Sequence, residues 1–267
     1  MIRLAVLAFA LAPLPALASL CHTFVEGVPG VRYAQIGTAS DARAEAVEIE
    51  YVAHSTYRIT TPAGVVIATD FFGMAGQGAV PDVVTMNHAH STHYTDYPDP
   101  AIRHVLRGWN PDGDGPAEHL LRTDDVVVRN VTTDIRSGWS GREPDGNSIF
   151  VFETAGICIG HLGHLHHTLS EQHYAMLGRM DVLMVPVDGT YTMNLDDMIG
   201  VADRLKSRIV LPMHAFGPGS MRIFLDGLAG SFAIERVDAP SIRVGVDSLP
   251  ERPTIVLTSR HRLRGFD

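Results

Sequence analysis

Residues 82–96 read DVVTMNHAHSTHYTD, a short apolar run that leads directly into three histidines. Residues 82–87 have the composition of a buried strand, and the histidines follow at positions 88, 90 and 93. A tight loop after a strand can direct all three imidazoles to one point, and imidazole is a common zinc ligand. The alternative is a solvated, histidine-rich loop. We predict that His88, His90 and His93 contribute to a metal site.

Two more apolar runs end at histidines. HLGHLHH (161–167) follows ICIG at 157–160, and LPMHAF (211–216) contains His214. Taken alone, His214 would be more typical of a buried core histidine, but with the other two groups it becomes a candidate ligand. Three strand ends therefore offer imidazoles, and ligand sites gather on loops that join such ends.

The remaining pattern alternates strands and helices. Strands are predicted at 46–53, in a hairpin over 56–69, and at 125–133, 148–153, 157–160, 182–187, 208–212, 232–237, 241–246 and 254–258. Helices are predicted at 169–177, where Thr168 and Glu171 have capping-box spacing, at 194–205 after the N-cap Asn194, and at 220–228. Hairpins first and alternation later favour an α/β protein with two mixed sheets and outer helices.

Residues 1–18 have the features of a signal peptide. One arginine precedes an apolar stretch too short to span a bilayer, and small residues then precede Ser19. An uncleaved anchor is the alternative, although Pro13 and Pro15 interrupt the segment. We expect a periplasmic or secreted protein without a stable membrane anchor.

After the signal peptide we expect an N-terminal extension at 19–45 and a single domain at 46–267. The formal net charge is −9 and basic runs are absent, which argues against nucleic acid and leaves a small molecule as the expected partner. The composition leaves the oligomeric state open. Cys21 and Cys158 allow one disulfide, which export permits but does not require, and two cysteines do not favour a thiolate metal site.

The chain resembles the metallo-β-lactamase superfamily. His88-x-His90-x-x-His93 is similar to its H-x-H-x-D-H signature, with Asp70 in place of its early aspartate and His214 in place of its last histidine. Three segments also resemble the branch related to ascorbate-phosphate lactonase and N-acyl-phosphatidylethanolamine phospholipase D: HLGHLHHTL (161–169), DVLMVPVDGTYTM (181–193) and IVLPMHAF (209–216). The resemblance covers about residues 46–216 and implies a four-layer αββα sandwich.

Several positions differ from that family. Thr92 and His164 stand where the family has metal-binding aspartates, Asp188 stands where glycine is usual, and residues 135–139 lack its middle histidine. A carboxylate can bridge two cations, whereas a neutral imidazole offers one lone pair and no negative charge. These changes favour one divalent metal, zinc or alternatively manganese, over a two-metal centre.

The expected ligands are all histidines. We expect an inner set, His88, His90 and His164, with His93 and His214 either completing it or lying within one water of it. A small change of register would direct His166 inward in place of His164.

Other residues are expected around the metal. Asp70 is predicted to orient a ligand histidine through its second ring nitrogen. His54 and His161 occupy positions where the family tends to have histidine, and their roles are structural or functional with equal support. His93 and Asp188 are candidate catalytic proton-transfer groups, because Thr92 removes the family's carboxylate base. No role is assigned to His22, His104, His119, His166, His167, His173 or His261.

These observations predict an exported metal-dependent hydrolase that uses metal-activated water on an ester, lactone, amide or phosphodiester. The main alternative is a non-catalytic periplasmic protein that binds a metal or ligand on a degenerate metallo-hydrolase fold. A metal-free structural relic is a further alternative.

Overall fold

The computed structural model describes Ser19, Cys21 and residues 45–87, 90–113, 115–138 and 141–262. The predicted signal peptide, most of the predicted extension and His88 lie outside the described residues.

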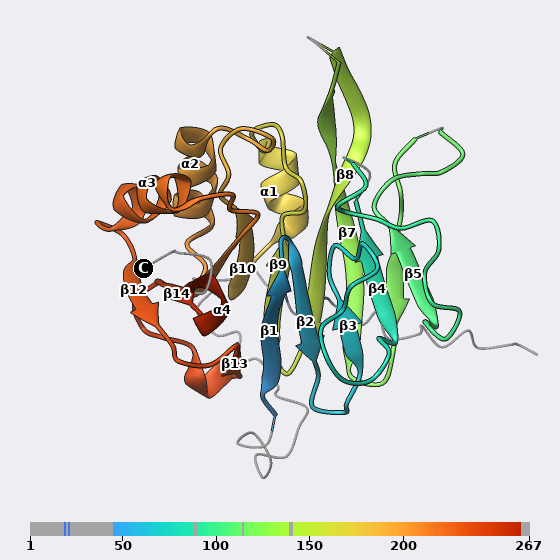
Figure 1. Cartoon of the computed structure of the whole chain (residues 1–267), viewed down its shortest axis with the longest axis horizontal. Helices are drawn as coiled ribbons and strands as arrows, with labels where there is room; N and C mark the ends of the chain where they lie inside the picture. The colour runs from blue at the N-terminus through green and yellow to red at the C-terminus, as the bar shows by residue number, and fades with distance from the viewer. Residues whose placement is uncertain are drawn as a thin grey trace, which may run out of the picture.

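The first sheet has six strands in the order β13-β1-β2-β3-β4-β5. Their bounds are β1 (Val47–Ala53), β2 (Thr56–Thr60), β3 (Val66–Ala68), β4 (Val83–Met86), β5 (His104–Arg107) and β13 (Ser241–Val244). β1, β2, β3 and β13 pair antiparallel, whereas β3, β4 and β5 pair parallel. Because β13 pairs with β1, segments nearly 200 residues apart in the sequence share this sheet (Figure 1).

The second sheet has eight strands in the order β12-β14-β11-β10-β9-β8-β7-β6. Their bounds are β6 (Leu120–Arg122), β7 (Val126–Ser137), β8 (Gly141–Thr154), β9 (Ile157–His161), β10 (Val182–Pro186), β11 (Ile209–Met213), β12 (Ala233–Arg236) and β14 (Thr254–Leu257). The strands from β12 to β9 pair parallel, and those from β9 to β6 pair antiparallel. The β7–β8 hairpin extends well beyond its neighbouring strands (Figure 1).

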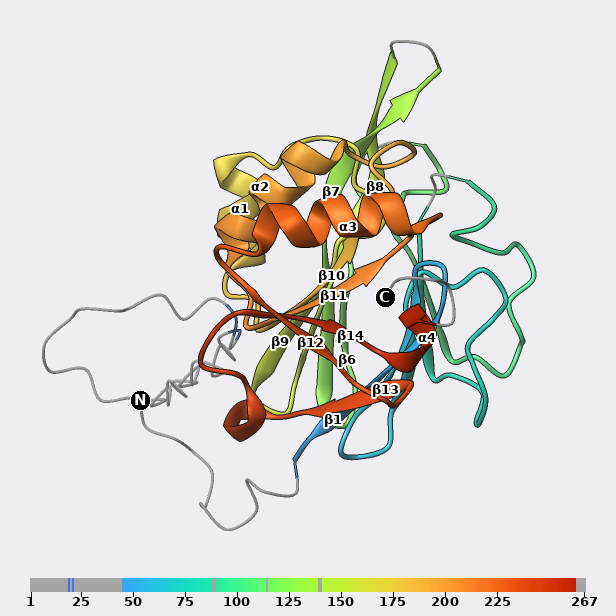
Figure 2. The same ribbon diagram turned by 60° about the vertical axis from the view of Figure 1, so that its left-hand side comes forward.

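Helices cover one side of this second sheet. α1 (Glu171–Leu177), α2 (Leu195–Leu205) and α3 (Pro218–Leu228) lie together over its strands, as Figure 2 shows. Their apolar faces pack on one side of the sheet, where Leu183 and Val210 are fully buried. The short elements η2 (Val246–Ser248) and α4 (Ser259–Arg262) complete the described chain.

Apolar side chains form three layers. One lies between the helices and the second sheet, and another lies between the two sheets around Tyr57 and Phe150. A third covers the outer side of the first sheet, where Val84 and Met86 pack against Phe71 and Ile102. The two mixed sheets with outer helices are confirmed. The fourth layer, expected to be helical, is irregular chain in the part that the structure describes.

Most predicted elements are present, with ends shifted by a few residues. The predicted N-terminus of α1 was wrong. Thr168 and Glu171 do not cap it. Instead the Ser170 hydroxyl accepts from the backbone N–H of His173, whose ring in turn accepts from the backbone N–H of Ser170. The short strands β5 and β6 were not predicted. In the described residues, no helix is long and apolar enough to cross a membrane.

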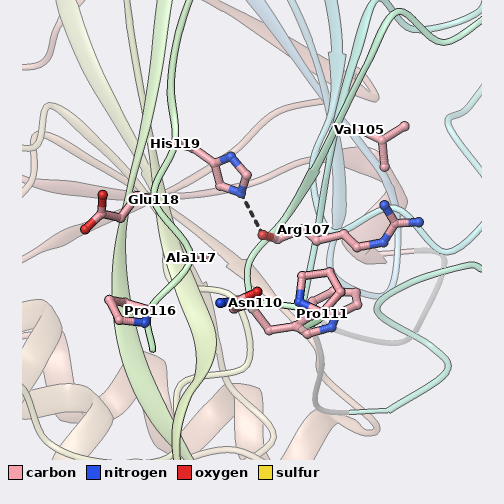
Figure 3. Close-up of a pocket in the computed structure, with 9 residues that line it drawn as sticks. Val105, Arg107, Asn110, Pro111, Pro116, Ala117, Glu118 and His119 are labelled. Carbon is pink, nitrogen blue, oxygen red and sulfur yellow. Dashed lines mark hydrogen bonds between the residues drawn. The ribbon is translucent and has the colours of Figure 1, made fainter. Parts of the chain in front are cut away.

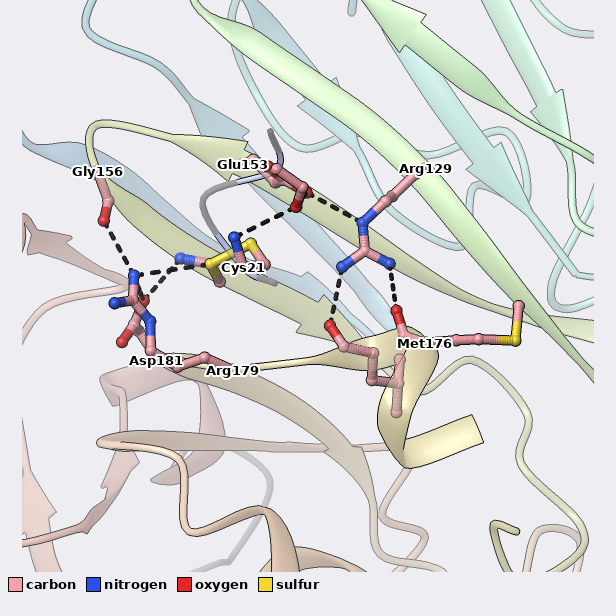
Figure 4. Close-up of a disulfide and its surroundings, with 10 residues drawn as sticks. Cys21, Arg129, Glu153, Gly156, Met176, Arg179 and Asp181 are labelled. Atoms are coloured by element: carbon pink, nitrogen blue, oxygen red, sulfur yellow. Dashed lines mark hydrogen bonds and ion pairs between the residues drawn. A yellow bond between two sulfur atoms is a disulfide. The ribbon is translucent and has the colours of Figure 1, made fainter. Parts of the chain in front are cut away.

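Cys21 and Cys158 form a disulfide that ties the N-terminal segment to β9 (Figure 4). The Ser19 hydroxyl donates to Glu153 on β8 over 2.6 Å. Arg129 on β7 also binds Glu153 and donates to the carbonyls of Met176 and Leu177 at the end of α1. Ser19 and Cys21 are therefore attached to the second sheet.

Candidate metal centre

The predicted site residues follow the carboxyl ends of strands from both sheets. Asp70 follows β3, His90 and His93 follow β4, and His164 follows β9. Asp188 follows β10 and His214 follows β11. Because parallel strands end at one edge of a sheet, the loops after them meet between the two sheets.

Four histidines come together at this edge: His90, His93, His164 and His214. One ring nitrogen from each lies within 4.8 Å of those from the other three. His93 and His214 are fully buried, and His164 is 1% exposed. The structure brings together four of the five predicted ligands, while the fifth, His88, lies outside the described residues. His93 and His214 are as much a part of the cluster as His90 and His164.

Two carboxylates hold two of these rings from behind. His93 Nδ1–H donates to Asp70 Oδ2 over 2.5 Å, and His214 Nδ1–H donates to Asp188 Oδ1 over 3.0 Å. Burial opposes ionisation of Asp70, but His93 and the Asn87 amide hold its pKa below the usual value. Burial likewise opposes ionisation of Asp188, but hydrogen bonds from His214 and Thr192 hold its pKa well below the usual range. Both aspartates are therefore ionised acceptors.

The other ring nitrogens of this pair fit a cation. With Nδ1 protonated, a neutral ring keeps a lone pair on Nε2, and His93 Nε2 lies 3.3 Å from His214 Nε2. Two facing lone pairs repel unless a cation or a proton lies between them. Two nitrogens bound to one tetrahedral zinc at 2.0–2.1 Å lie roughly 3.3–3.4 Å apart. The residues present therefore fit a divalent metal.

His90 connects the cluster to Thr92 and His54. Its Nδ1 lies 2.8 Å from the Thr92 hydroxyl, which lies 3.1 Å from His54 Nε2. Burial, followed by the nearby His214 and His93, lowers the pKa of His54 to about 3. Burial and His93 also lower the pKa of His90. Thr92, in the family's aspartate position, thus links two neutral imidazoles.

His164 is held from behind by His166, a residue to which the sequence assigned no role. His166 Nε2 lies 2.8 Å from His164 Nδ1, and His166 Nδ1 accepts the backbone N–H of Arg136 over 2.7 Å. Burial lowers the pKa of His166 to about 4, with a further contribution from Arg136. Burial also lowers the pKa of His164, as do His93 and His214. The sequence spacing of His166 could not reveal this role, because its bond to the Arg136 backbone on β7 forms only in the folded chain.

Arg136 occupies the segment where the family's middle histidine was expected. Its guanidinium donates to the carbonyls of Thr190, Tyr191 and Thr192. It therefore fastens the β7–β8 hairpin to the loop that follows Asp188.

The remaining predicted residues shape this edge. His161 is fully buried and bonds the Ser55 carbonyl through Nε2, while its Nδ1 accepts from the Gly163 backbone N–H. Its contacts are structural. The backbone φ is positive at His54, Asp70 and His214, which are three of the six non-glycine residues with that conformation in the described chain. Such strain is concentrated where surrounding contacts hold a site in place.

The two catalytic candidates lie inside or behind the cluster. The Nε2 atom of His93 points to His214 rather than to open space. The oxygens of Asp188 accept from His214, from the backbone N–H groups of Thr190, Tyr191 and Thr192, and from two threonine hydroxyls. This geometry suits positioning groups better than a free base.

An open pocket of about 490 Å³ leads to the cluster. It is lined by His54, His90, Thr92, Asp188, Thr190, Tyr191 and Phe216. The described residues near 109–118 line a different cavity of about 350 Å³ (Figure 3). There His119 Nε2–H donates to the Arg107 carbonyl over 2.7 Å. None of the four clustered histidines lines that second cavity.

Two mixed sheets with an imidazole cluster at their shared carboxyl edge define the metallo-β-lactamase fold. The chain belongs to the metallo-β-lactamase superfamily, because the profile of the family described as "Beta-lactamase superfamily domain" matches residues 48–214, more than half of its length.

Its relatives include metal-dependent hydrolases. One from Cupriavidus metallidurans is 27% identical over 214 aligned residues, covering 62% of this chain and 72% of that protein. Another from Anaeromyxobacter dehalogenans is 26% identical, covering 68% and 82%. A Thermotoga maritima structure, assigned to a Zn-dependent hydrolase of the metallo-β-lactamase superfamily, matches with a TM-score of 0.56 and 25% identity over 79% of this chain and 98% of that one. A Parabacteroides distasonis structure shares the fold, with a TM-score of 0.51 and 14% identity.

Proposed function

We propose that this chain is an exported hydrolase that binds one divalent metal, zinc in preference to manganese, at the four-histidine cluster. The convergence of His90, His93, His164 and His214 carries the proposal. An all-nitrogen set suits zinc, whereas manganese prefers carboxylate and carbonyl oxygens. The relatives support hydrolysis, since those named above are metal-dependent hydrolases.

A divalent cation at this position would activate water and polarise a substrate oxygen. The protein's own contribution is orientation. Asp70 and Asp188 fix the rings of His93 and His214 with Nδ1 protonated, so that both Nε2 lone pairs face one point. Asn87 donates to the second oxygen of Asp70 and so fixes that carboxylate in turn.

The pocket supports a neutral substrate. No lysine or arginine is among the described residues that line it. Tyr191 and Phe216 form one wall, with ring centroids 5.4 Å apart, and each is 61% exposed. We therefore favour an ester, lactone or amide with an apolar group over a phosphodiester, whose charge only the metal would balance.

Export is supported by the signal-like segment 1–18 and by the Cys21–Cys158 disulfide. Disulfides persist in oxidising compartments such as the periplasm and are rare in the cytosol. Cys21 lies two residues after the predicted mature end at Ser19, so the bond would also fasten the new N-terminus.

The test combines elemental analysis with a substrate screen on residues 19–267. We expect about one zinc per chain and turnover of at least one neutral ester, lactone or amide. His93→Ala and His214→Ala should each lose the metal and the activity. His104→Gln on β5 is the matched control and should retain both.

A folded protein without metal, even after incubation with zinc or manganese, would contradict the proposal. One equivalent of metal without turnover of any substrate class would instead identify a non-catalytic metal-binding protein. Thr92 and His164 motivate this second candidate, because both replace carboxylates that the family uses.

A further inference from the structure

We propose that His164 is a hydrogen-bond donor in the site and not a metal ligand, so that His90, His93 and His214 are the described ligands. This inference rests on the proposed function and refines it. It assigns a distinct role to the residue that stands where the family has its bridging aspartate.

The argument begins at a backbone amide, which can only donate. The N–H of Arg136 donates to His166 Nδ1 over 2.7 Å, so this nitrogen is an acceptor without a proton. A ring that keeps one proton must then carry it on Nε2. His166 therefore has its hydrogen on the nitrogen that faces His164.

The next hydrogen bond determines which nitrogen of His164 carries the proton. His166 Nε2 lies 2.8 Å from His164 Nδ1, and only His166 can donate in this pair. His164 Nδ1 is thus an acceptor, and the single proton of the neutral ring lies on Nε2. That atom points into the cluster, 3.1 Å from His90 Nε2.

The same order of donors and acceptors leaves a lone pair on His90 Nε2, which makes His90 a suitable metal ligand. Because His164 donates to it, His90 Nε2 holds a lone pair and His90 Nδ1–H donates to the Thr92 hydroxyl over 2.8 Å. The hydroxyl can then donate to His54 Nε2 over 3.1 Å. A cation that takes the Nε2 lone pair of His90 leaves these outer bonds intact and frees the N–H of His164.

The residue bonded to the outer nitrogen of each ring decides whether that histidine is a metal ligand or a hydrogen-bond donor. Asp70 and Asp188 accept hydrogen bonds from Nδ1–H of His93 and His214, so the inner nitrogens of these rings carry lone pairs. His166 donates a hydrogen bond to His164 Nδ1, so the inner nitrogen of His164 carries the N–H. Three lone pairs and one donor therefore meet at one point, which matches a three-histidine metal site with a position left for water.

The N–H of His164 can stabilise negative charge that develops on a substrate oxygen. The ring is 1% exposed, and its backbone N–H is fixed by Asn147 Oδ1 over 2.8 Å. A rigid, buried donor that already points to the reacting oxygen needs little reorganisation during the reaction. His166 and the Arg136 backbone act as positioning groups that hold the His164 tautomer.

The direct test is nuclear magnetic resonance of ¹⁵N-histidine-labelled protein, residues 19–267, with and without zinc. Long-range proton–nitrogen correlations identify which nitrogen of His164 carries hydrogen, and His164→Gln assigns the signals. We expect Nε2–H in both states. Zinc coordination by His164 Nε2, or a proton on Nδ1, would overturn the inference.

Failure of the proposed function gives a different result. If no zinc binds, the hydrolase proposal and the three-histidine site both fail, but the tautomer of His164 is still read in the metal-free protein. Nδ1–H there would refute the hydrogen-bond chain itself.

Two variants separate a donor from a ligand. His164→Leu removes the N–H, and His164→Gln retains an N–H donor on a side chain without the ring. Both should still bind one zinc per chain, because neither change removes a ligand. In His164→Leu we expect kcat to fall about 100-fold, with partial recovery in His164→Gln. Loss of zinc from both variants, as expected for His93→Gln, would show that His164 is a ligand.

Discussion

Asp70 and Asp188 lie behind His93 and His214, and each fixes which ring nitrogen is free. The resemblance to the family's early aspartate predicted Asp70 as an orienting residue, and in the structure its Oδ2 lies 2.5 Å from His93 Nδ1. Asp188 was predicted as a proton-transfer group, but its oxygens are bound to His214 and the 190–192 backbone. The contacts of Asp70 are those expected of an orienting residue, whereas the contacts of Asp188 do not suit a free proton-transfer group.

Replacing Asp70 by asparagine should weaken metal binding. The amide cannot stabilise the Nδ1–H tautomer of His93 as the buried carboxylate does, and loss of such a partner costs about 10–100-fold in metal affinity. Chelator competition measures the change. Asp203→Asn on the exposed end of α2 is the control, and equal affinity in both variants would refute the role of Asp70.

The metal-free protein should lose stability as the pH falls below about 6.5, the ordinary histidine value. Burial lowers the pKa of His54 to about 3 and of His166 to about 4 in the folded state. Between those values and 6.5 the unfolded chain binds more protons, so the free energy of unfolding decreases as the pH decreases.

Urea denaturation at pH 7.5, 6 and 5, in the presence of a chelator, tests this dependence. His166→Gln removes one of the two shifted groups and should reduce the pH dependence, whereas His104→Gln should leave it unchanged. A midpoint of unfolding that is constant over this range would contradict the prediction.

Strands were easier to predict than the ends of helices. Apolar runs before His88 and His214 showed where β4 and β11 end, because a buried strand needs a run of apolar residues. The N-terminus of α1 was placed wrongly, since Thr168 and Ser170 both offer a hydroxyl and only the folded chain shows which accepts from His173. β5 and β6 are too short, at four and three residues, to show a periodic pattern.

The Cys21–Cys158 disulfide, which attaches the N-terminal segment to the second sheet, should raise the free energy of unfolding. Cys21 and Cys158 are 137 residues apart, and a disulfide typically stabilises a protein by about 2–4 kcal/mol. Replacing both cysteines by serine should lower the free energy of unfolding by this amount, measured in urea. Ser19→Ala, which loses only the bond to Glu153, should have a smaller effect, and an unchanged midpoint in the double variant would contradict the prediction.

The metal site lies where the two sheets meet, so it joins the halves of the molecule. His90 and His93 follow a strand of the first sheet, whereas His164 and His214 follow strands of the second. A cation held by His90 and His93 from the first sheet and by His214 from the second is bound by the folded state alone. Metal removal should therefore destabilise the whole molecule and not one loop.

At zinc concentrations 100-fold above Kd, binding adds about 2.7 kcal/mol to the free energy of unfolding. For a chain of this size, that corresponds to a Tm about 5–11 °C lower after chelation. Differential scanning calorimetry measures the shift. His93→Ala should melt at the same temperature with and without chelator, and a shift of equal size in that variant would contradict the assignment.

The sequence by itself determined the fold family, the strand ends that carry the site and the predominance of imidazole, because these depend on residue type and local spacing. Only the tertiary structure decided which partner lies behind each ring. Asp70, Asp188 and His166 come from different segments, and the partner of a ring fixes which nitrogen carries its proton. That choice separates a metal ligand from a hydrogen-bond donor, and it depends on contacts across two sheets that no local pattern encodes.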